Sequence, residues 1–218
     1  MGAALLKTRF ETFLGGHLDW QSRPAPELLP TGVPGVELPR GALTEIYGPA
    51  TSGRTSLLLS ILAAATARGE ACALIDTDDA FHPASASAAG VELGRLLWIR
   101  CRQNGEHALK AADLLTQGGG FGVVALDLGD TPPATARRIS LTSWFRLRRA
   151  VENTPTVLVA LSRQPNAKTC ASLAIDCRRE RALWTGQTPG RLFRGLRLRA
   201  TAHQRSKSCS PVFTATAI

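Results

Sequence analysis

Residues 48–55 combine the glycines, hydroxyls and positive charge that a phosphate-binding loop requires. They read Gly-Pro-Ala-Thr-Ser-Gly-Arg-Thr and match the pattern G-x-x-x-x-G-K-[ST], except that an arginine replaces the lysine. In such a loop, backbone N–H groups surround a phosphate at the positive end of a helix, and the Thr hydroxyl binds magnesium. The residues predicted to contact the phosphates of ATP or ADP are Gly48, Pro49, Ala50, Thr51, Ser52, Gly53, Arg54, Thr55 and Ser56.

Arg54 decides how such a loop would work. Its side chain keeps the positive charge of lysine but is longer, planar and fork-shaped. It can hold a phosphate through two hydrogen bonds, yet it fits poorly against a phosphoryl group in transfer. We therefore expect the loop to have kept nucleotide binding even where hydrolysis is lost. The alternative is a glycine-rich turn that has no ligand.

Carboxylates follow two of the expected strands. Asp127 ends the apolar run of residues 123–126, which is the form of a Walker B motif, whose Asp holds magnesium, usually through water. Asp127 and Thr55 are therefore the predicted magnesium ligands. In the other cluster, of Asp76, Asp78 and Asp79, a carboxylate could polarise the attacking water. For Asp76 and Asp79, a solvated, helix-capping turn is an equal alternative.

The elements that must position these residues alternate along the chain. Apolar runs predict strands at 43–47, 71–75, 96–99, 121–126 and 156–161, and the segments between them favour helices, among them 56–65, 106–117 and 139–153. Uninterrupted apolar strands separated by helices indicate an α/β fold whose mostly parallel sheet is covered on both faces.

The two ends of the chain depart from this alternation. Residues 3–18 have helical spacing, and residues 17–40 are rich in Pro and Gly and predict an irregular connector. Residues 173–178, 196–203 and 211–218 predict strands, the last two as an antiparallel hairpin. We expect an N-terminal helix and connector over 1–40 and a single core domain over 41–218.

Charge is distributed unevenly. Residues 1–130 hold 10 Lys and Arg against 14 Asp and Glu, whereas residues 131–218 hold 16 against 3. This asymmetry favours an acidic partner such as nucleic acid, although a solvated arginine-rich surface is an equal alternative. Two basic patches are candidates for nucleic-acid or protein contact, and they consist of Arg138, Phe145, Arg146 and Arg149, and of Arg194, Arg197 and Arg199.

Composition limits the remaining classes. The five cysteines show no C-x-x-C spacing, which argues against a zinc site or a disulfide framework and favours a reducing compartment. No apolar run approaches the roughly 20 residues that cross a bilayer. We expect a cytoplasmic protein that does not contact a membrane.

Taken together, these motifs resemble the RecA recombinase family. Residues 29–32 and 38–49 are similar to the approach to the RecA phosphate-binding loop, and residues 73–83 are similar to the segment that contains its catalytic glutamate. Residues 196–218 resemble the final hairpin of the RecA core. The resemblance runs from about residue 29 to the C-terminus and implies a RecA-like core.

The chain departs from the RecA pattern at several functional positions. The resemblance places Asp78 at the catalytic glutamate, Arg163 at the phosphate-sensing glutamine and Ser85 near the tyrosine that packs on adenine. The first and second DNA-binding loops are expected to shrink to residues 131–138 and 164–169, and we expect no counterpart of the separate C-terminal domain of RecA in this sequence. These departures argue against hydrolysis, filament formation and strand exchange.

Short, degenerate RecA relatives of this kind include the ImuA proteins, which are related to SulA. That resemblance implies an accessory protein in DNA repair and SOS damage tolerance that binds ATP or ADP with Mg²⁺ weakly or structurally. Its expected partners are a RecA recombinase or an ImuB-like polymerase adaptor, together with single-stranded DNA. A DNA-dependent ATPase of the recombinase type and a scaffold that binds no nucleotide are the alternatives.

Overall fold

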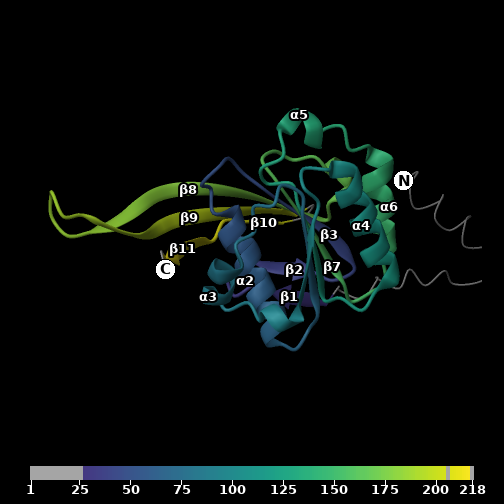
Figure 1. Ribbon diagram of the computed structural model, residues 1–218, viewed down its shortest axis with the longest axis horizontal. Helices are drawn as coiled ribbons and strands as arrows, with labels where there is room; N and C mark the ends of the chain where they lie inside the picture. Colours follow the sequence, from purple (N-terminus) through teal and green to yellow (C-terminus); the bar gives the residue numbers. More distant parts are fainter. Residues whose placement is uncertain (1–26, 205–206, 217–218) are drawn as a thin grey trace, which may run out of the picture.

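The chain folds around one large, mostly parallel sheet (Figure 1). The structure is a computed structural model and describes residues 27–204 and 207–216. The strand order is β10-β9-β8-β3-β7-β6-β4-β5, and β11 pairs with β9. The parallel strands are β3 (Ala42–Tyr47), β4 (Cys72–Asp76), β5 (Leu96–Arg100), β6 (Val123–Asp127), β7 (Val157–Ser162) and β8 (Leu173–Thr185). These strands confirm the predicted α/β class.

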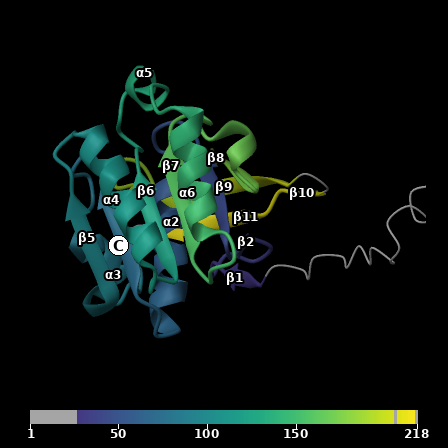
Figure 2. The same ribbon diagram turned by 90° about the vertical axis from the view of Figure 1, so that its right-hand side faces the viewer.

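Helices cover both faces of the sheet, as Figures 1 and 2 show. On one face lie α2 (Arg54–Ala67) and α3 (Pro83–Ala88), and on the other lie α4 (Gly105–Gly118) and α6 (Leu141–Val151). The short helix α5 (Pro133–Ala136) occupies part of the predicted first loop, and 3₁₀ turns span Leu93–Arg95 and Lys168–Cys170.

Strand residues alternate between two apolar cores. Ile46 of β3 packs into the core on the α2 side, whereas Leu43 of the same strand packs into the core below α4 and α6. On α6, Trp144, Leu147 and Val151 are buried, as their helical spacing predicts. Both faces of the parallel strands are therefore sealed, which leaves the carboxyl ends of the strands as the place for a site.

A small hairpin replaces part of the predicted irregular connector. Strands β1 (Leu28–Pro30) and β2 (Glu37–Pro39) pair antiparallel, and Leu29 and Leu38 are fully buried in the α2-side core. The hydroxyl of Thr31 donates to the carbonyl of Val36 at 2.7 Å and closes the turn. The predicted N-terminal helix and the connector up to residue 26 lie outside the described residues.

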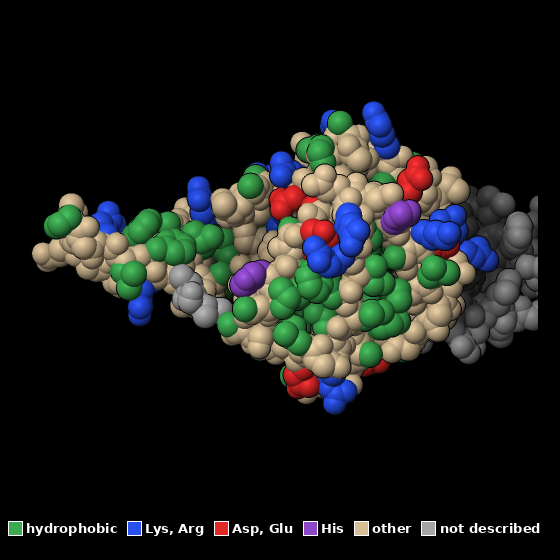
Figure 3. Space-filling view, in the orientation of Figure 1, with side chains coloured by type: hydrophobic (Ala, Val, Ile, Leu, Met, Phe, Trp, Pro, Cys, Tyr) green, Lys and Arg blue, Asp and Glu red, His purple; other side chains and the backbone are tan. Residues whose placement is uncertain are grey.

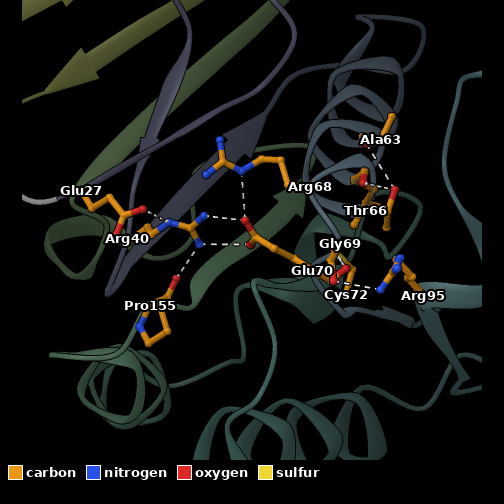
Figure 4. A network of polar contacts seen from close by, with 11 residues as sticks. Glu27, Arg40, Ala63, Thr66, Arg68, Gly69, Glu70, Cys72, Arg95 and Pro155 are labelled. Atoms are coloured by element: carbon orange, nitrogen blue, oxygen red, sulfur yellow. Dashed lines mark hydrogen bonds and ion pairs between the residues drawn. The ribbon is translucent and has the colours of Figure 1, made fainter.

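Arg40 fastens this hairpin to the body of the protein (Figure 4). Its guanidinium donates to both carboxylate oxygens of Glu70, at 3.2 and 2.7 Å, and to the carbonyl of Pro155 at 2.9 Å. Glu27 lies 3.2 Å from its Nε. The hydrogen bond to Glu70 is the main cause that raises the pKa of Arg40. One side chain with 7% exposure thus joins three separate segments.

The C-terminal strands are longer than the sequence predicts. Strand β8 (Leu173–Thr185) runs parallel to β3, and β9 (Leu192–Gln204) pairs antiparallel with β8. The two form a ribbon that projects away from the body (Figure 1). Strand β11 (Val212–Thr216) pairs with β9 and confirms the predicted hairpin, while β10 (Lys207–Cys209) adds a short edge.

Among the residues that the structure describes, no helix combines the length and apolar character that a membrane span requires.

Candidate nucleotide-binding site

The loop of residues 48–53 joins β3 to α2, which is the strand–loop–helix order that the sequence predicts. Gly53 is the N-cap of α2 and has a left-handed conformation, with φ of 87°, and no side chain caps the helix there. The first N–H groups of an α-helix have no partner within the helix. They therefore stay available to a phosphate, together with the positive end of the helix dipole.

Strands β8 and β9 of the C-terminal ribbon pack directly against the loop. A Cβ at Gly53 would overlap the side chain of Leu198 on β9, and a Cβ at Gly48 would overlap the carbonyl of Cys177 on β8. Ser52 is buried, and its hydroxyl has no hydrogen-bond partner in the structure. The loop is thus held between the parallel sheet and the ribbon.

Arg54 is folded across this loop. Its side chain is 6% exposed, and its guanidinium donates to the carbonyl of Gly48 and to the carbonyl of Gly129, the latter at 2.5 Å. Asp130 lies 3.6 Å away. Burial is the main cause that lowers the pKa of Arg54, and the charges of Asp127 and Asp130 work against it. The arginine therefore ties the loop to the segment that follows β6.

Arg163 converges on the same segment from the end of β7. Its Nε donates to the carbonyl of Gly129 at 3.1 Å, and its Nη2 lies 3.4 Å from Asp130. The structure thus brings together Arg54 and Arg163, which are 109 positions apart in the sequence and were both predicted as nucleotide contacts. Gly129 and Asp130 were missed, and the only signal for them is their place directly after the Walker B strand.

A cavity of about 250 Å³ opens beside the loop. Thr55 and Asp127, the predicted magnesium ligands, both line it, as does Ser85. No group of three or more His, Cys, Asp or Glu that could hold a metal occurs in the described residues. Thr55 and Asp127 fit a magnesium ion that keeps several waters and takes its other ligands from phosphate oxygens, as is usual for this ion.

The Asp127 carboxylate is partly buried and lies near the charges of Arg54, Asp76 and Asp130. It accepts a hydrogen bond from the N–H of Gly129 at 2.7 Å. Burial raises the pKa of Asp127 to about 7, although this hydrogen bond and the charge of Arg54 act in the opposite direction. A nearby cation would stabilise the charged form of this carboxylate.

The three carboxylates after β4 have different surroundings. Asp78, the predicted catalytic residue, accepts a hydrogen bond from the hydroxyl of Thr131 at 2.6 Å. Asp79 pairs with Arg100 at 3.1 Å. Asp76 is not a solvated capping residue, because it is buried. It accepts from the N–H groups of Ala80 and Phe81, both at 3.0 Å, and from Nε1 of Trp98 at 3.1 Å.

Glu45 is a further buried acid that sequence reasoning missed. It lies in β3 with 1% exposure, and its Oε1 accepts from the N–H groups of Asn166 and Ala167, at 2.5 and 3.0 Å. Burial raises the pKa of Glu45, and these two hydrogen bonds offset the effect only in part. The acid fixes the loop of residues 164–169, for which the sequence predicts a shortened second DNA-binding loop. A charged residue inside an apolar strand was the available signal.

The two basic patches lie on different elements. Phe145 is half exposed on α6, and Arg146 beside it pairs with Asp113 of α4 at 2.9 Å. Arg138 and Arg149 are exposed. On the ribbon, which projects on the opposite side of the molecule (Figure 1), the other three predicted patch residues are Arg194, Arg197 and Arg199. The structure does not join the patches into one surface.

The segment that carries these motifs matches the model of a known protein family. Residues 28–132 match the family model of the RecA N-terminal domain. The match begins at the small hairpin and includes the phosphate-binding loop, Asp78 and Asp127. It supports a relationship between this chain and the RecA-like superfamily, in agreement with the fold.

Proposed function

We propose that this chain is a RecA-like accessory protein of DNA repair and damage tolerance, of the ImuA type. In this proposal it binds ATP or ADP with Mg²⁺ at the loop of residues 48–56 and turns the nucleotide over poorly. The observation that carries the proposal is the position of Arg54, whose guanidinium lies between the carbonyls of Gly48 and Gly129.

The geometry of Arg54 favours binding over chemistry. An arginine has five N–H donors, so the two bonds to carbonyls leave three for phosphate oxygens. The N–H groups at the start of α2 supply the remaining contacts. Hydrolysis needs donors that follow the charge as it develops on the transferring group. A guanidinium anchored to one carbonyl of the loop and to another in the segment after β6 cannot move in this way.

Asp78 supports the same conclusion. It is shorter than the glutamate that the RecA resemblance implies at this position, and it accepts a hydrogen bond from Thr131. A base must lie within hydrogen-bond reach of the water that it activates. We propose that Asp78 holds the loop after β6 as much as it acts on water.

Function then depends on partners. A nucleotide that is held without rapid turnover can stabilise one conformation of a protein for another molecule to bind. We propose that the partner in the cytoplasm is a RecA recombinase or an ImuB-like polymerase adaptor, with single-stranded DNA as a further contact. The excess of Lys and Arg in residues 131–218 supports an acidic partner.

The test measures equilibrium binding of ATP and ADP with Mg²⁺ to the wild type, Arg54→Ala and Arg54→Lys. We expect binding to weaken at least tenfold in Arg54→Ala, which corresponds to about 1.4 kcal/mol. In Arg54→Lys we expect turnover to rise above the wild-type rate, because lysine reaches the phosphates without holding both carbonyls. Arg95→Ala is the matched control, because this arginine pairs with Glu92 on the surface.

Two results would favour the alternatives. Rapid wild-type turnover with single-stranded DNA that is lost in Asp78→Ala would indicate a recombinase-type ATPase. The cavity lined by Thr55 and Asp127 is the observation that favours this second candidate. Equal nucleotide binding by the wild type and Arg54→Ala would instead indicate a scaffold.

A further inference from the structure

The projecting part of the ribbon, residues 178–199, is here called the arm. It contains seven arginines and one acidic residue, Glu180. Its far half extends beyond the body of the protein, and apolar and basic side chains are interspersed along it (Figures 1 and 3). Strand β11 pairs with Gly195–Arg199, so only the far end of the arm is two-stranded, and a two-stranded ribbon alone is at best marginally stable in water.

Most of the positive charge on the arm is not neutralised. Arg197 and Arg199 share Glu180, at 3.1 and 2.8 Å. Within the described part of the chain, the exposed side chains of Arg179, Arg181 and Arg194 form no ion pair or hydrogen bond, and they are distributed over both strands.

Aromatic rings meet at the far end of the arm. Trp184 and Phe193 face each other across β8 and β9 with their ring centroids 5.3 Å apart in an edge-to-face arrangement. The guanidinium of Arg191 lies 5.7 Å from the centre of the Trp184 ring. Trp184 is 49% exposed and Phe193 is 39% exposed. The two exposed rings form one contiguous apolar patch with an arginine at its edge, and contiguous apolar patches with polar rims mark interaction sites.

We propose that the arm binds single-stranded nucleic acid, with a base stacked at Trp184 and phosphates contacted by Arg179, Arg181 and Arg194. Arginines interleaved with open aromatic rings are the combination that binds single strands without sequence preference. The arm holds seven arginines and one acidic residue, and this one-sided charge matches a strand that carries a phosphate at every nucleotide. The charge pattern therefore favours nucleic acid over an acidic protein.

This inference gives a site to the nucleic-acid contact in the proposed function and rests on it in that respect only. Trp184 and the three arginines do not line the cavity beside the phosphate-binding loop. Nucleotide binding and arm binding can therefore be measured separately on the same variants.

The experiment uses the full chain and a fluorescent oligothymidine of about 20 nucleotides, followed by anisotropy over a range of salt concentrations. We expect Trp184→Ala to weaken binding roughly tenfold, because stacking on an aromatic side chain contributes about this factor per base or more. Trp184→Phe should retain most of the affinity. The combined Arg179→Ala, Arg181→Ala and Arg194→Ala variant should lower the salt slope by about 2, from about 0.7 per phosphate contact.

Two controls separate stacking from damage to the fold. With an abasic oligonucleotide of equal length, Trp184→Ala and the wild type should bind equally, since no base is present to stack. The pair Arg138→Ala and Arg149→Ala removes charge from α6 and from the segment just before it, and should change the affinity less than the arm variants do.

Several results would overturn the proposal. These are no binding by the wild type, equal binding by Trp184→Ala and the wild type, or a Trp184→Ala defect that persists on abasic strands. Equally strong competition by a polyglutamate of matching charge would show that the arm takes an acidic protein instead. Loss of oligonucleotide binding while ATP binding persists leaves the nucleotide proposal intact, and loss of ATP binding alone leaves the arm intact.

Discussion

The Arg54→Ala variant should be markedly less stable than the wild type. Its guanidinium makes two hydrogen bonds to backbone carbonyls, and such bonds to a charged group contribute about 1.5–3 kcal/mol each. The pair with Asp130 adds little, because that carboxylate is 56% exposed. Water entering the adjacent cavity will satisfy part of what the carbonyls lose. We expect the free energy of unfolding to fall by about 3 kcal/mol.

Urea denaturation followed by circular dichroism measures this change, and thermal unfolding provides a second measure. For a chain of this size, a loss of about 3 kcal/mol lowers the Tm by roughly 6–12 °C. Arg54→Lys keeps the charge but cannot hold both carbonyls, so it should lose roughly half as much. Arg137→Ala, at an exposed arginine, should change stability by less than about 0.5 kcal/mol. If Arg54→Ala behaves like Arg137→Ala, the guanidinium does not tie the loop to Gly129, and the proposed limit on turnover loses its basis.

Three further predictions concern buried carboxylates. The pKa of Asp127 is raised from 3.8 to about 7, so its contribution to the free energy of unfolding should fall by up to about 4 kcal/mol as the pH rises through this window. In urea denaturation measured over this pH range, Asp127→Asn should remove that pH dependence. Burial raises the pKa of Glu70, but Arg40 and Arg68 together more than reverse this and the net pKa is lowered. Glu70→Gln should therefore cost about 2 kcal/mol at neutral pH, and this cost should shrink as the pH falls below 4.5 toward the lowered pKa. A pH-independent cost would contradict the ion pair. Glu45→Ala should accelerate amide hydrogen exchange at Asn166, measured by mass spectrometry, whereas Glu45→Gln keeps an acceptor and should exchange more slowly.

The parts of the site that follow from local pattern could be predicted from the sequence. The loop of residues 48–55 and the acid at Asp127 are each read from a strand and the residues directly after it. Their meeting at one cavity follows from parallel strands, whose carboxyl ends lie at one edge of the sheet. The α/β class follows from the same alternation.

Contacts to backbone atoms could not be predicted. A carbonyl carries no side-chain signature, so nothing in the sequence marks Gly129 as the acceptor for both Arg54 and Arg163. The same holds for Glu45, whose partners are N–H groups about 120 positions away. Side-chain types indicate which groups need a partner, but not which backbone atoms supply one.

The length of the arm was also underestimated. Residues 179–183 place three charged side chains in a row beside apolar ones, and the register of β8 with β9 shifts twice in this region. These bulges interrupt the two-residue alternation of polar and apolar side chains by which a strand is identified in a sequence. Pairing with the partner strand, which the sequence of one strand does not show, extends β8 through this segment.

The close approach of Leu198 to Gly53 gives a reason for the glycine of the loop motif that does not involve phosphate binding. Gly53 has a conformation that other residues rarely adopt, and the space for a Cβ is filled by Leu198. Both constraints come from the fold alone and would persist in a chain that never meets a phosphate. At the neighbouring position 54, the fold accepts an arginine in place of the lysine of the motif. In this protein the fold alone requires the glycine at position 53, so its presence is not evidence that the loop binds phosphate. Only the basic residue and the carboxylates are evidence for chemistry.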